Sequence, residues 1–129
     1  MSHFSKINTK IRNKPELIEA LELLQYDVQE DQELKVTGAH GIKHEVVEAE
    51  VAIAKDIGFR MNPHTGEYEL VADLETWNQP VPVERFVDKV TQQYARMTVY
   101  NTVKKMGFEV QEEWEMDNNS IEITATRWV

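Results

Sequence analysis

Two segments of the chain resemble each other at a spacing of 82 residues. Leu24–Asp31 (LQYDVQED) aligns with Met106–Glu113 (MGFEVQEE). Upstream, apolar residues at matching positions extend the similarity, namely Leu17 and Leu21 in the first copy and Val99 and Val103 in the second. Each copy predicts the end of a helix, a turn, and a strand with an aromatic residue at its start. A chain with two such units must contain at least two helices, each followed by a strand.

The sequence around the two units predicts further elements. Alternation of apolar and polar residues indicates a strand over His3–Ile11, and Asn13 followed by Pro15 and Glu16 marks the start of a helix that ends near Gln25. A long helix is expected over Val83–Met106, with Gly107 in the left-handed position that ends it. Strands are expected over Tyr26–Val36, over Val47–Phe59 with a bulge at Gly58, and over Tyr68–Ala72, Phe108–Trp114 and Ile121–Ala125. A turn is expected over Asn62–Gly66, because Pro63 and Gly66 are typical turn residues.

This order of elements predicts an α+β fold. It is close to the ferredoxin-like, split β-α-β plan: a mainly antiparallel sheet with extra strands and two helices on one face. With 129 residues, of which 41% are hydrophobic, the chain can bury one core, and we expect a single domain over residues 1–129.

Composition excludes several classes of protein. The absence of cysteine excludes disulfide frameworks, zinc ribbons and thiol catalysis. A net charge of −9 argues against nucleic acid as a partner. No apolar run is long enough for an integral membrane segment. No glycine-rich phosphate loop or nucleophile motif is present, so no cofactor is predicted.

The long helix carries two apolar stripes on roughly opposite sides. Its first turns present Val83, Phe86, Val87, Val90, Tyr94 and Met97. Its last turns present Val99, Val103 and Met106, the stripe that aligns with the core stripe of the first helix. One straight helix cannot direct both stripes into one core. Either the helix kinks near Arg96–Thr98, or its N-terminal half packs on the hairpin around Tyr68–Ala72 or on another chain.

One weak motif points to metal chemistry. His40 and His44, followed by Glu45, have the spacing that places two imidazoles on one face of a helix. Gly38 and Gly41 argue against a helix there, so we predict no metal site and keep a metal-dependent enzyme only as a minor alternative.

Six short segments together resemble the hypothetical chloroplast reading frame 35 family of cyanobacterial and plastid proteins. They are Ser2–Ile7, Thr9–Ile11, Val81–Phe86, Gln92–Ala95, Gly107–Phe108 and Arg127–Trp128. Arg96 departs from the family pattern, where an aromatic residue is expected. The resemblance implies a protein of the cytoplasm or of the plastid stroma and no assigned reaction, so it transfers no catalytic residue.

The leading hypothesis is a non-enzymatic protein-interaction or assembly-factor domain. Its partner is an unidentified protein, with a homodimer through the long helix as one form. The expected contacts are Arg85, Phe86, Lys89, Gln93, Tyr94 and Trp128, because basic and aromatic residues dominate interface energies. The alternative is a regulatory domain that binds a small molecule between the sheet and the long hairpin.

Overall fold

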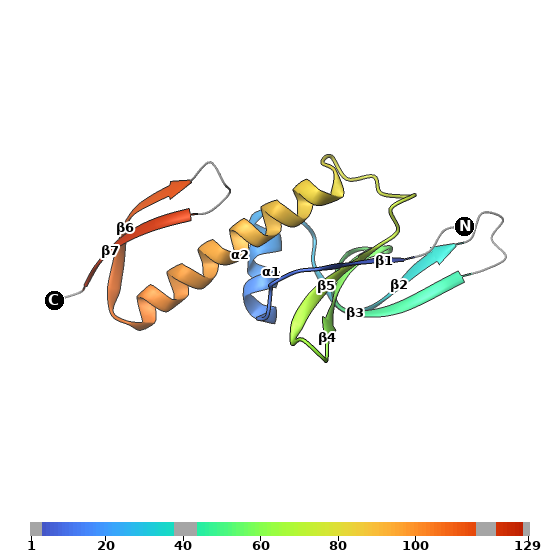
Figure 1. Ribbon diagram of the computed structural model, residues 1–129, viewed down its shortest axis with the longest axis horizontal. Coiled ribbons are helices and arrows are strands. Elements are labelled where there is room, and N and C mark those ends of the chain that lie inside the picture. Colours follow the sequence, from blue (N-terminus) through green and yellow to red (C-terminus); the bar gives the residue numbers. More distant parts are fainter. Residues whose placement is uncertain (1–3, 38–43, 116–120, 128–129) are drawn as a thin grey trace.

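The computed structural model describes residues 4–37, 44–115 and 121–127 (Figure 1). Two helices lie among the strands, and all elements occur in the chain order β1 (Ser5–Asn8), α1 (Lys14–Leu23), β2 (Gln29–Thr37), β3 (His44–Ala54), β4 (Ile57–Asn62), β5 (Glu67–Ala72), α2 (Val83–Lys105), β6 (Phe108–Glu115) and β7 (Ile121–Arg127).

Five of these strands form one antiparallel sheet in the order β1-β5-β4-β3-β2, and β6 pairs with β7 in a separate two-stranded sheet. The α+β class is therefore confirmed. The ferredoxin-like plan is not, because the strands on either side of α1 lie at opposite edges of the sheet instead of flanking one common neighbour. Strands β2 to β5 follow one another in the chain, and each pairs with the next. As a result, β2 lies at the edge of the sheet opposite to β1.

The single strand expected over Val47–Phe59 is wrong. Lys55 and Asp56 form a tight turn that divides it into β3 and β4, and these two strands pair with each other. Neither residue is a glycine or a proline, so the strongest sequence signals for a turn are missing here. The turn predicted at Asn62–Gly66 is confirmed, with Gly66 at φ 71°.

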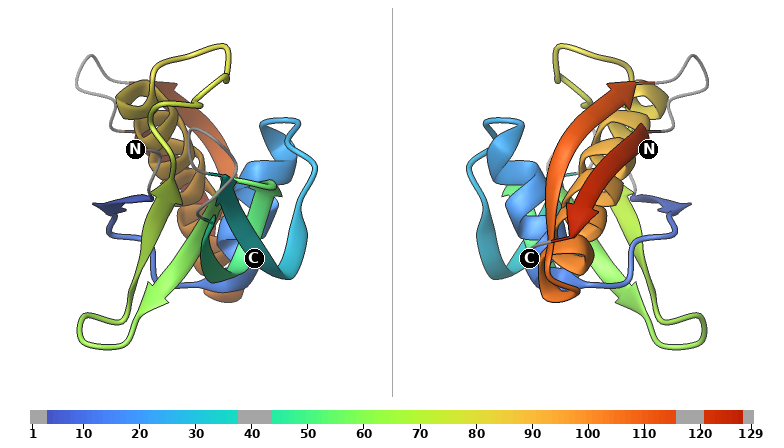
Figure 2. Two further views of the ribbon diagram at one scale, coloured as in Figure 1. Left: turned by 90° about the vertical axis from the view of Figure 1, so that its right-hand side faces the viewer. Right: turned by 90° about the vertical axis from the view of Figure 1, so that its left-hand side faces the viewer.

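One face of the five-stranded sheet carries the main core. Strand residues such as Phe59 and Leu70 pack there with Leu17 and Leu21 of α1 and with Phe86 of α2. Figure 2 shows α1 and α2 side by side in both views. Both helices contribute to this one cluster, as expected for helices on one face of a sheet.

A smaller core covers the opposite face of the sheet. Phe4, Leu34, Ala49, Ala52 and Val71 pack together there. The β2–β3 ribbon curls over this face, so that the Lys35 N–H donates to the Lys55 carbonyl at 2.8 Å. Gly58 lies beneath it, where a Cβ atom would come within 2.7 Å of the Val51 carbonyl oxygen. Only glycine fits at this crossing without a shift of the backbone.

The repeat suggested that the C-terminal apolar stripe of α2 is the core stripe, but the N-terminal stripe is the buried one. The N-terminal stripe enters the core of the sheet, where Phe86 and Val90 are each 1% exposed. The C-terminal half extends beyond the sheet towards the β6–β7 hairpin, and Val99 and Met106 are 37% and 61% exposed (Figure 1). The helix is one element from Val83 to Lys105. Of the two alternatives, the contacts support the one in which the N-terminal half packs on the hairpin around Tyr68–Ala72. The stripes are separated along the helix because its second half lies outside the sheet.

The repeat has a structural counterpart at the ends of the helices. After α1, Gln25 adopts φ 70°. Its N–H donates a hydrogen bond to the Glu22 carbonyl, and the Tyr26 N–H donates one to the Leu21 carbonyl. These bonds form a Schellman cap. After α2, the aligned Gly107 adopts φ 80° and donates to the Lys104 carbonyl. The two copies of the repeat therefore encode the same type of helix end.

Candidate functional site

Phe86 is a core residue and is not available to a partner. Its ring makes edge contacts with Tyr26 and Trp77, with centroids 5.3 Å apart in both pairs, and a tilted contact with Phe59 at 6.3 Å. Trp77 is held in place because its indole N–H donates to the Val81 carbonyl at 2.8 Å. The expectation that Phe86 contacts a partner is therefore wrong, because the N-terminal stripe of α2 packs against this chain's own sheet.

Tyr94 also serves the fold. Its hydroxyl accepts the backbone N–H groups of Arg12 and Asn13, each at 3.2 Å. These donors lie just before α1, where the first N–H groups have no partner within the helix. One helical turn further along α2, Thr98 donates to the Glu16 carboxylate at 2.6 Å. Tyr94 therefore lies on the side of α2 that holds the start of α1, and it is half-buried.

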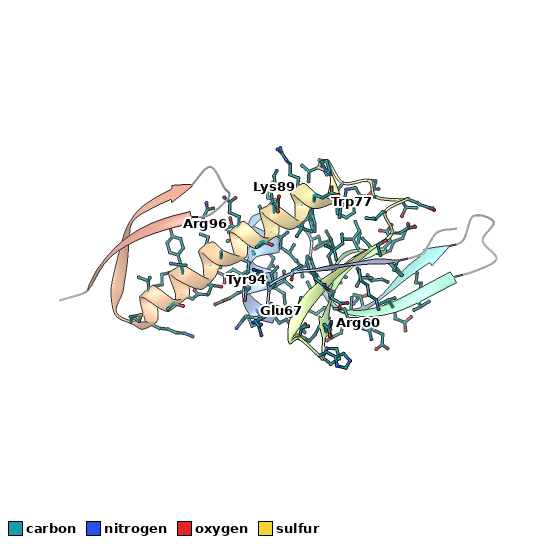
Figure 3. The ribbon with its side chains drawn as sticks, in the orientation of Figure 1. Arg60, Glu67, Trp77, Lys89, Tyr94 and Arg96 are labelled. Carbon is teal, nitrogen blue, oxygen red and sulfur yellow. The ribbon has the colours of Figure 1, made fainter. Side chains whose placement is uncertain are left out.

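The remaining described candidates lie on the other side of α2. Arg85 and Lys89 are exposed, and Gln93 is half-buried, with its side-chain oxygen accepting from Arg96 at 2.9 Å. Figure 3 shows Lys89 and Arg96 on the side of α2 away from Tyr94. Trp128 lies outside the described residues. The structure thus separates the six predicted contacts and leaves Arg85, Lys89 and Gln93 on the outer side.

Sequence reasoning missed four exposed residues on the second half of α2: Ala95, Val99, Thr102 and Met106. The signal was present, because Val99 and Met106 belong to the second stripe. Their alignment with the core stripe of α1 led to their assignment as core. We define the outer face of α2 as the exposed residues on this side of the helix: Glu84, Arg85, Asp88, Lys89, Ala95, Val99, Thr102 and the cap residue Met106.

The residues proposed for a metal-dependent enzyme do not form a helical motif. His44 and Glu45 begin strand β3, and His40 lies outside the described residues. Within the part of the chain that the structure describes, no three His, Asp or Glu side chains are grouped so as to hold a metal ion.

A cavity of about 330 Å³ lies on the β2–β3 ribbon. It is lined by Asp31, Gln32, Glu33, Glu48, Ala49 and Glu50. Its charged groups are all carboxylates, so it offers mainly hydrogen-bond acceptors. One of them is already used, because Glu50 accepts the Met61 N–H at 3.1 Å.

The shifted pKa values have structural causes. Burial raises the pKa of Tyr26 and of Tyr68, both of which contribute to the main core. The hydrogen bond to Glu30, at 3.1 Å, raises the pKa of Lys14. Each shift therefore follows from packing or pairing.

Known proteins resemble this chain over nearly its whole length. The family described as "Protein of unknown function (DUF1257)" matches residues 20–124. "Uncharacterized protein ycf35" of Guillardia theta is 36% identical over 99% of this chain and 98% of its own length, and the protein of that name in Pyropia yezoensis has the same values. The protein of that name in Cyanophora paradoxa is 33% identical over the same shares.

No solved structure matches the chain. Neither helix in the described ranges is long and apolar enough to cross a membrane. The match to most of the chain, together with full-length relatives above 30% identity, shows the family: the chain belongs to DUF1257, with the ycf35 proteins, as the resemblance in its sequence predicted.

Proposed function

We propose that the chain is a protein-interaction or assembly-factor domain that binds a partner protein through the outer face of α2, in the plastid stroma or the cytoplasm. The observation that carries this proposal is the charge of α2. The helix has five basic and two acidic residues, a sum of +3, in a chain whose net charge is −9.

Four of the five cationic side chains of this helix are available for binding. Arg85, Lys89, Lys104 and Lys105 are all exposed, and none of them forms an ion pair with another described residue. Basic groups on a helix surface that form no ion pair with the described residues attract an acidic partner and orient it. Gln93 supports this surface, because it holds Arg96 through a hydrogen bond along the same helix.

The proposal is tested by charge reversal on folded protein. The double variant Arg85→Glu/Lys89→Glu, the wild type and a control double variant, Lys6→Glu/Lys10→Glu, are immobilised and exposed to a lysate of the cells that make the protein. All four positions are exposed, so both variants change the net charge equally without touching the core. We expect a stoichiometric partner on the wild type and the control and its loss from the α2 variant. Equal capture by all three proteins would contradict the proposal.

A further inference from the structure

We draw no further inference here: the strongest candidate, the exposed apolar patch of Val99 and Met106 on the second half of α2, carries none, because nothing in the described residues shows what covers it.

Discussion

Single side chains join the two helices of this fold through polar contacts at the start of α1. Asn13 caps the helix by accepting the Glu16 N–H at 3.2 Å. The Glu16 carboxylate accepts from Thr98 and from Asn101 of α2, and the Tyr94 hydroxyl accepts two N–H groups just before α1. Because the first N–H groups of a helix lack partners within it, these contacts fix where α1 begins and how it meets α2.

The Tyr94 hydroxyl gives a prediction at the scale of one atom. Tyr94→Phe leaves the ring in place and removes the acceptor for the Arg12 and Asn13 N–H groups, so we expect a loss of about 1 kcal/mol in the free energy of unfolding. Urea denaturation followed by circular dichroism measures this loss. Tyr26→Phe is the control, because the Tyr26 hydroxyl has no hydrogen bond to a described residue and its ring contact with Phe86 is kept. Equal stability of the Tyr94→Phe variant and the wild type would show that water replaces the hydroxyl at no cost.

These contacts also mark the limit of sequence reasoning for single residues. Asn13, Pro15 and Glu16 predicted the start of α1 because a cap is encoded by neighbours in the chain. Tyr94 was predicted to contact a partner because its type suits interfaces. Its actual partners lie 81 and 82 residues away in the chain, and sequence spacing carries no information about such a contact.

At the scale of elements, the two helix ends encoded by the repeat make a matched pair for experiment. Gln25 and Gly107 adopt the same left-handed conformation at the same point of the cap, but only glycine does so without steric cost. We expect Gln25→Gly to raise the free energy of unfolding by roughly 0.5–1 kcal/mol and Gly107→Gln to lower it by a similar amount. A Cβ atom at Gly107 meets nothing within 4 Å, so the second change reports backbone conformation alone.

The control for this pair is Gln25→Ala, which keeps the steric cost at position 25 and should not stabilise the protein. Thermal and urea unfolding of the three variants give the comparison. A destabilised Gln25→Gly variant would mean that the Gln25 side chain contributes more than its conformation costs.

Single helices and turns were predicted better than the order of the strands in the sheet. Capping residues and turn glycines predicted both helices and the turn at Asn62–Gly66, since these signals act within a few residues. The order of the strands in the sheet was not predicted, because it depends on the turn at Lys55–Asp56. This turn contains no glycine or proline that would indicate it in the sequence. The periodicity of α2 correctly separated two faces but could not say which one meets the sheet. The outer face was therefore named in part, through Arg85 and Lys89, and its exposed apolar residues Val99 and Met106 were missed.

At the scale of the whole molecule, the chain is elongated, with the five-stranded sheet at one end and the β6–β7 hairpin beside the far half of α2 (Figures 1 and 2). An isolated two-stranded hairpin is marginally stable in water, so this one depends on its contact with α2. That half of α2 has exposed apolar residues, whereas the first half is anchored by Phe86 and Val90. The free energy of local opening should therefore be lower for the hairpin than for the sheet.

Native-state hydrogen exchange on the full chain tests this gradient. We expect the amides of β6 and β7 to exchange through local opening, and those of β4 and β5 to exchange only when the whole domain unfolds. Phe86→Leu separates the two routes, because Phe86 is a central residue of the main core. It should lower the global free energy by roughly 1–2 kcal/mol and so reduce protection of β4 and β5 about tenfold, while exchange in the hairpin stays the same. If protection falls equally in both sheets, the hairpin unfolds with the core, and residues 1–129 form one cooperative unit.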